Sequence, residues 1–318
     1  SPYIEEWPES IRRNRLFPMD KAEAQDVVNA WERANCLGEL ESFSVAERAD
    51  YLWSAASMKG KLSDATFFGG ILETRFRAEG LRDHVGRLMR RLREKNNRIG
   101  SKGGTLFDAF LYAAAADAVG IPGIDLNVIA DLLGVDRRDR RTKILTPLGL
   151  EAVGTGSGTA LRTRHPAIAK AAIIIAEEEL EEDLEEVYKD IVRGTAETRV
   201  EIPVTPFAEV LHCAPILLTT LPELGIPFDR AKGIAIAVAD EAERAGEDSD
   251  FLVFTVTRAK TYREAGDNIG ATQILRLAIP TALARRDWSS MGRSYINELA
   301  VCEGKIGNPL ISFWLGGL

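Results

Sequence analysis

One stretch of the sequence constrains the fold more than any other, the residues 161–176. Pro166 suits the first turn of a helix, where its missing N–H costs nothing, so His165 is expected at or near the helix cap. From Ala167 to Ala176 the only polar residue is Lys170, so the helix is expected to be buried. A run of isoleucines within it would also suit a strand, but the leading proline favours a helix.

The residues in front of His165 indicate a β-hairpin. Leu161 to Arg164 alternate as in a strand, which places Arg162 and Arg164 on one face. The glycine-rich segment 154–159 is typical of a turn between two short strands. A hairpin therefore leads into a buried helix that has a histidine at its mouth and two arginines beside it.

Size and composition limit the class of protein. At 318 residues, 45% hydrophobic and 28% charged, the chain is globular and long enough for two or three domains. Its net charge of −8 argues against a general nucleic-acid binder. The three cysteines are widely separated, as in a cytoplasmic protein with reduced thiols, and no apolar run approaches the roughly 18 residues of a membrane span.

Almost all of the remaining sequence predicts helices. Periodicity and capping residues place them at 21–34, 45–57, 67–77, 81–95, 105–119, 126–133 and 137–148. The last three, the hairpin and the buried helix follow one another in the order of a winged helix. The polar, glycine-rich segment 98–104 and the prolines at 203 and 206 are expected to mark domain boundaries.

Two charged runs are interpreted as solvent-exposed. On the helix at 81–95 the face opposite the apolar stripe carries Arg87, Arg90, Arg91, Arg93 and Lys95, and eight of the ten residues at 177–186 are acidic. Such runs are usually solvated faces. We therefore expect a solvated basic helix face and a solvated acidic connector, with a partner-binding acidic tail as the less favoured alternative.

The C-terminal third contains an internal repeat. The segment from Trp288 to Tyr295 fits the tetratricopeptide opening with Met in place of Leu, and Ala259 and Tyr262 occupy equivalent places one repeat earlier. The two tyrosines lie 33 residues apart, close to the period of about 34. The expected packing positions are Ala271, Leu275 and Ala278. We expect tetratricopeptide-like repeats rather than generic hairpins, and further repeats beyond position 318 in a longer protein.

The sequence contains no common catalytic motif. It has no phosphate-binding P-loop, Rossmann fingerprint, H-E-x-x-H, C-x-x-C or G-x-S-x-G. The histidines are isolated from one another and from the cysteines, so we expect neither a metal centre nor an enzyme in this chain. His84 and His212 are expected to be structural.

His165 is the candidate with a chemical role. A helix N-terminus attracts anions such as phosphate because its first N–H groups are unpaired. The same field favours a neutral imidazole, and Arg162 and Arg164 could add charge-assisted contacts. The alternative is that His165 follows Leu161 and Thr163 on the core side of the strand and only caps the helix. The pattern alone leaves both open.

Several pieces of the chain, taken in order, resemble the regulatory half of STAND nucleotide-binding proteins, particularly those of bacterial anti-phage defence. In this family a P-loop ATPase core is followed by a helical lid, a winged helix and repeats. The resembling pieces are Phe17–Asp20, Leu37–Leu40, Ser44–Arg48, Gly104–Phe110, Ile129–Val135 and Leu161–Ala169. The resemblance implies a mainly α fold, with a helical lid at 1–100, a winged helix and acidic connector helix at 101–200, and tetratricopeptide-like repeats at 201–318.

The resemblance also implies a nucleotide contact. The family's winged helix carries a Met-His-Asp motif whose histidine contacts the β-phosphate of bound ADP. His165 matches the middle position, whereas Arg164 and Pro166 replace the Met and the Asp. His165, with Arg164 and Arg162 beside it, would therefore contact the nucleotide.

Partners and cofactors follow from the same family. The P-loop core is not among these 318 residues, so ATP or ADP and Mg would be bound by a parent protein rather than by this fragment. The implied partners are that P-loop core, an unidentified protein trigger on the repeats, and further copies of the protein in a homo-oligomer formed on activation. No membrane partner is implied.

Two other functions compete with this one. A winged-helix DNA-binding regulator would use the basic third helix, with Arg162 and Arg164 on the wing. That helix carries Arg137, Arg138, Arg140, Arg141 and Lys143. Neighbouring acidic residues reduce the net positive charge of this patch, and the order of the motifs favours the STAND interpretation. A plain interaction scaffold without nucleotide linkage is the third possibility.

Overall fold

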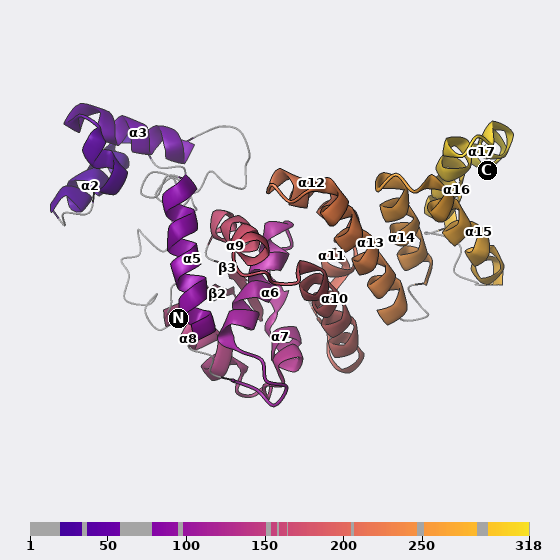
Figure 1. The fold of residues 1–318 in the computed structure, drawn as a ribbon, viewed down its shortest axis with the longest axis horizontal. Helices are drawn as coiled ribbons and strands as arrows, with labels where there is room; N and C mark the ends of the chain where they lie inside the picture. The colour runs from indigo at the N-terminus through magenta and orange to yellow at the C-terminus, as the bar shows by residue number, and fades with distance from the viewer. Residues whose placement is uncertain are drawn as a thin grey trace.

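The protein is described by a computed structural model and is mainly helical, as predicted. The described residues are 20–33, 37–57, 78–94, 98–150, 154–157, 159–163, 165–204, 207–246, 251–284 and 292–317. Figure 1 shows the elements following one another along the long axis of the molecule, from the N-terminal helices at one end to the C-terminal helices at the other. The helix predicted at 67–77 lies outside the described residues.

The N-terminal part has a small hydrophobic core of its own. Helices α2 (Lys21–Arg33) and α3 (Val45–Ser57) pack against each other, with the 3-10 helix η1 (Gly38–Ser42) between them in sequence. The buried side chains are Ala24, Val28, Leu37, Leu40, Ala49 and Leu52. The apolar positions spaced along α2 and α3 therefore face each other, as an amphipathic helix pair requires.

The central part combines helices with a small antiparallel sheet. Its elements are α5 (Ala78–Glu94), α6 (Leu106–Ala118), β1 (Ile124–Asp125), α7 (Leu126–Leu133), the π-helical segment η2 (Arg141–Leu145), α8 (Thr146–Leu150), β2 (Gly154–Ser157), β3 (Ala160–Thr163) and α9 (Pro166–Glu178). The strand order is β1-β3-β2, and both pairings are antiparallel. The predicted hairpin is present, but Gly154–Ser157 is itself a strand that pairs with Ala160–Thr163, so the turn is shorter than expected.

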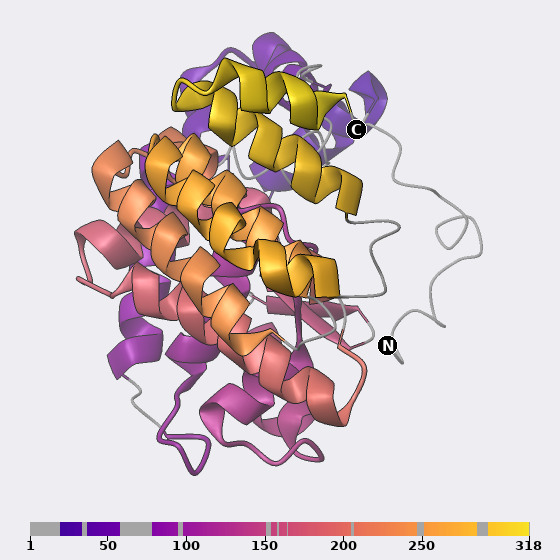
Figure 2. The same cartoon turned by 90° about the vertical axis from the view of Figure 1, so that its right-hand side faces the viewer.

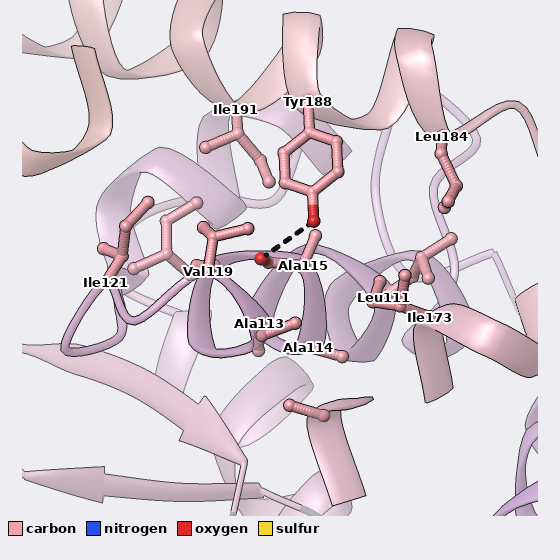
Figure 3. Close-up of a cluster of buried hydrophobic side chains, with 14 of the residues drawn as sticks. Leu111, Ala113, Ala114, Ala115, Val119, Ile121, Ile173, Leu184, Tyr188 and Ile191 are labelled. Carbon is pink, nitrogen blue, oxygen red and sulfur yellow. Dashed lines mark hydrogen bonds between the residues drawn. The ribbon is translucent and has the colours of Figure 1, made fainter. Parts of the chain in front are cut away.

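Helix α6 lies at the centre of this core. The side chain of Thr105 accepts from the N–H of Asp108 in a capping box, and nine of the helix's thirteen residues are buried. Its alanines leave room for α9 on one side and for α10 (Leu184–Glu201) on another. Figure 3 shows the contact with α10, where the Tyr188 hydroxyl donates to the carbonyl of Ala115 at 3.2 Å.

The third helix of the central part differs from the one predicted at 137–148. Asp136 accepts a hydrogen bond from the N–H of Arg138 at 2.8 Å, residues 137–139 form a turn, and helical structure begins at 140. The chain then enters η2 and continues as α8. Pro147 lies in α8 directly after η2, and the helix continues past it to Leu150.

The hydrophobic core crosses both expected domain boundaries. One cluster of buried residues extends from Val85 to Ala265. Helix α5, expected in the first domain, packs on α9, and α10 packs on both α7 and α13 (Phe228–Ala245). A continuous core does not divide the chain near 100 or near 200. The two boundaries therefore remain predictions.

The C-terminal part is built of helices that pack in succession. They are α11 (Phe207–Leu211), α12 (Ala214–Glu223), α13, α14 (Phe251–Glu264), α15 (Asn268–Ala284), α16 (Gly292–Lys305) and α17 (Pro309–Gly316). Figure 2 shows the orange and yellow helices lying side by side. Helix α14 contributes Phe254 to the central cluster, and Leu252 and Ala259 to a second cluster with α15 and α16.

The packing positions predicted in the repeat are buried. Ala271, Leu275 and Ala278 of α15 join Tyr295 of α16 in the second cluster, and the Tyr295 hydroxyl donates to the carbonyl of Leu275. Residues 285–291, which include Trp288, lie outside the described residues. This burial is what either tetratricopeptide-like repeats or generic helical hairpins require, so the type of repeat remains a prediction.

We expect Ile173→Ala to lower the urea midpoint of unfolding far more than Ile174→Ala. Ile173 is fully buried in α9, whereas the next residue is only partly buried. Truncating Ile173 leaves a cavity that costs about 2–5 kcal/mol. Ile174→Ala is the matched control, with the same chemistry one position along the helix. Equal losses in the two variants would contradict the orientation of α9 in the core.

Candidate functional site

His165 is the cap of helix α9, as the sequence predicts. Its backbone is extended, and its Nδ1 accepts a hydrogen bond from the N–H of Ala167 at 3.1 Å. A ring nitrogen that accepts a hydrogen bond carries no proton, so the ring is neutral and its proton is on Nε2.

The imidazole lies on the core side of the strand that leads to it. His165 is 5% exposed, and Leu161 and Thr163, at alternate positions before it, are buried as well. This is the arrangement of the alternative in which His165 only caps the helix. An external phosphate can contact a ring covered to this extent only after the residues around the mouth of α9 move. The nucleotide contact of His165 remains a prediction.

The predictions for the two arginines beside His165 have different outcomes. Arg162 is exposed on the opposite face of β3, and its Nε lies 4.0 Å from Oδ1 of Asp117. Arg164 lies outside the described residues. Of the predicted trio, the structure therefore places one arginine on the solvent side and the histidine on the core side, rather than bringing both to one surface.

Asp117 is a site residue that the sequence analysis missed. It lies near the C-terminal end of α6, and its Oδ2 accepts from the N–H of Thr163 at 2.5 Å and from the Thr163 hydroxyl at 2.6 Å. The same hydroxyl lies 3.1 Å from the carbonyl oxygen of His165, so its one proton serves one acceptor at a time. These contacts tie α6 to the strand and to the cap of α9.

Burial determines the electrostatics of Asp117. Its side chain is 6% exposed, and burial raises its pKa above the ordinary value, although the Thr163 hydrogen bonds and Arg162 oppose that rise. A lone carboxylate in the alanine-rich run of α6 was the sequence signal for this role. The arrangement can hold the cap and the strand in register, and it contains no second titratable group poised for acid–base chemistry among these contacts.

The other two histidines lie on other segments of the chain. His212 Nδ1 lies 2.8 Å from the hydroxyl of Thr257, a contact that joins the segment after α11 to α14. His84 lies on the exposed face of α5. Within the part of the chain that the structure describes, no three metal-ligating side chains of the His, Cys, Asp or Glu type come together.

A second candidate feature is a network of ion pairs between α5 and the acidic run, here called the charged junction. It consists of Arg82, Arg90 and Arg93 of α5 with Glu178, Glu179 and Glu182. Arg82 donates to Glu178 at 2.7 Å, and Arg90 donates to Glu179 at 2.7 Å. The Arg93 guanidinium also donates to the carbonyl of Leu180 at 3.2 Å.

The charged junction shows that the two charged runs, which are partly exposed to solvent, also pair with each other. Burial raises the pKa of Glu179, but hydrogen bonds from Arg82 and Arg90 outweigh it, so the pKa is lowered overall. On the other side of the run, Arg230 of α13 donates to Glu177 at 3.2 Å and to Asp183 at 3.3 Å. The acidic connector therefore joins α5 to α13.

No known protein family, curated protein or solved structure matches this chain. Among the helices in the described ranges, none combines the length and the apolar character that crossing a bilayer needs.

We expect Asp117→Ala to lower the free energy of unfolding by about 1–3 kcal/mol, because it leaves the buried N–H of Thr163 without its acceptor. Asp117→Asn is the matched control, since its amide oxygen accepts the same bond without a charge. Urea unfolding measures both variants against the wild type. An Ala variant as stable as the Asn variant would contradict this role.

The same pair of proteins tests the ionisation of Asp117. Burial raises its folded-state pKa above the ordinary 3.8, so the folded state takes up the proton before the unfolded state as the pH falls. The wild type should therefore gain stability relative to Asp117→Asn as the pH is lowered from neutral through that raised pKa. A wild-type loss relative to the Asn variant over this range would show the opposite sign.

We expect Glu179→Lys to lower the thermal midpoint, because a cation then faces both Arg82 and Arg90. Adding Arg90→Glu should restore about 0.5–1 kcal/mol in a double-mutant cycle, the magnitude of a partly exposed pair. Arg87→Glu, on the same helix but outside the charged junction, is the matched control. Both the loss and the rescue should diminish at about 0.5 M NaCl. Rescue by Arg87→Glu of equal size would show that only net charge matters.

Proposed function

We propose that this chain is the regulatory and sensor part of a STAND NTPase of the bacterial anti-phage defence type. Its central part acts as a winged helix that gates the nucleotide state, and its C-terminal helices act as tetratricopeptide-like repeats that bind a trigger protein. The P-loop core of the parent protein binds ATP or ADP with Mg, and activation assembles the parent protein into a homo-oligomer.

One observation carries this proposal, the order of elements that ends at His165. Helices α6, α7 and α8 are followed by the β2–β3 hairpin and by α9, and β1 adds the third strand of the sheet. A hairpin joined to three helices by a short strand is the plan of a winged helix. The histidine that the resemblance assigns to the nucleotide caps the helix that directly follows the wing.

The state of the site supports gating through two arrangements. In this arrangement His165 is covered and serves as a cap, so contact with a phosphate belongs to a second arrangement in which the mouth of α9 is open. The charged junction lies at the other end of α9, and its ion pairs are partly exposed. Pairs of this kind exchange partners at low cost, because water and ions compensate each broken contact.

The contacts of the basic third helix favour nucleotide gating over DNA binding. Arg137 donates to Asp131 at 2.9 Å and pairs with Glu201 of α10 at 2.9 Å. Lys143 pairs with Asp139 at 2.9 Å. Two of the five cations that would have to face a major groove are thus already engaged by carboxylates, one of which comes from α10.

We expect His165→Ala to release ADP at least about tenfold faster in the protein that contains the P-loop core, because a hydrogen bond to a charged phosphate contributes about 1.5–3 kcal/mol. The measurement is the displacement of a fluorescent ADP analogue by unlabelled ADP. Faster exchange should be accompanied by higher basal activity of the parent protein.

His165→Asn separates the two roles of this residue. Asparagine is a good helix cap and accepts the same N–H bond, but it has no imidazole. If the imidazole contacts the phosphate, both variants release ADP faster. If His165 is only a cap, the Asn variant retains ADP like the wild type, and the nucleotide role is removed.

A further inference from the structure

A groove opens on the surface formed by helices α13, α14 and α15. Its volume is 500 Å³, and its lining includes Glu243, Phe251, Arg258, Tyr262, Ile274 and Leu277. The lining of α15 falls at positions 270, 273, 274, 277, 278 and 281, which lie on one face of a helix. The groove is thus bounded by a continuous stripe of α15 on one side and by α14 on the other.

One wall of the groove is apolar and open to solvent. Leu277 is 81% exposed although it lies between the partly buried Ile274 and the lining residue Thr281. Phe251 of α14 contributes a partly buried aromatic ring to the same lining. An exposed leucine beside an aromatic residue in a groove provides a site for a large apolar side chain.

The other wall contains Glu243 and Arg258, and the partly exposed Asp240 lies just outside the lining, where it contacts two lining residues. Arg258 donates to Asp240 at 2.6 Å and to Glu243 at 2.5 Å, and its guanidinium lies over the ring of Tyr262 at 5.5 Å. The Tyr262 hydroxyl donates to Asp240 at 3.1 Å. Two carboxylates therefore engage one guanidinium, so this arginine is not available for an anionic ligand. A cation brought to this wall would meet the surplus carboxylate charge.

We propose that this groove binds a peptide segment that places a large apolar side chain beside a lysine or arginine. The apolar side chain packs on Leu277, Ile274 and Phe251, and the cation pairs with Glu243 at the edge of the groove that adjoins Asp240. The inference rests on the proposed function in one respect, since it names the chemistry of the trigger segment that the repeats recognise. An acidic or phosphorylated segment would face the carboxylates and is excluded on charge.

The test is a selection of displayed random peptides on the purified chain, with counter-selection on the Leu277→Asp variant. Enriched sequences should share a bulky apolar residue close to a lysine or arginine. A synthetic copy of the most enriched peptide should bind Leu277→Asp at least about tenfold more weakly than the wild type. Glu243→Gln should weaken binding about threefold and reduce its dependence on salt.

Leu283→Asp is the matched control. Leu283 is an exposed leucine on the same helix outside the groove, so this variant should bind the peptide like the wild type. Enrichment of acidic peptides, or of peptides that bind both aspartate variants equally, would overturn the proposal. Concentration-dependent self-association of the chain that Leu277→Asp abolishes would overturn it as well, since the occupant would then be a second copy.

The peptide experiment needs no nucleotide, so its outcome is independent of the ADP measurement on His165. Either proposal can therefore be contradicted while the other is supported. Circular dichroism and the thermal midpoint show whether each variant is folded. Because Leu277 and Leu283 are both exposed, the two aspartate variants should fold equally well.

Discussion

The enclosure of helix α6 is the constraint on which the centre of the molecule depends. Nine of its thirteen residues are buried, and the alanines among them let α9 and α10 approach its backbone closely. Interiors are packed about as densely as organic crystals, so this small-residue surface fixes where the neighbouring helices lie. The same helix carries Asp117, whose bonds to Thr163 extend the constraint from the core to the strand and the cap of His165.

Local signals in the sequence predicted most of the elements. The helix after Pro166, the hairpin before it and the helices capped by Thr105 and Asp125 are present because capping, periodicity and proline placement act within a few residues. The third helix is present but begins a few residues later than predicted, and its first part, Arg141–Leu145, is π-helical. The domain boundaries near 100 and 200 remain predictions, since a glycine-rich or proline-rich segment does not report whether the core continues past it.

The candidate site was predictable only in part. The position of His165 at the helix cap followed from Pro166. Its burial agrees with the strand alternation, which was one of the two interpretations that the sequence left open. Asp117 lies 46 residues before Thr163, and Arg82 lies 97 before Glu179, so neither contact is encoded in any local pattern. Opposite charges on two separate runs were visible in the sequence, but their complementarity becomes evident only when α5 and α9 are packed together.

Helix α14 has a consequence for how the two ends of the molecule communicate. It contributes Phe254 and the adjoining Ala265 to the central core, and Leu252 and Ala259 to the C-terminal core. A helix with residues in two cores cannot tilt or slide without repacking both, because packed interiors deform in discrete steps. It also forms one wall of the groove. A ligand whose binding shifted α14 would therefore change the packing of both cores, because the helix moves as one rigid element and not as a flexible linker.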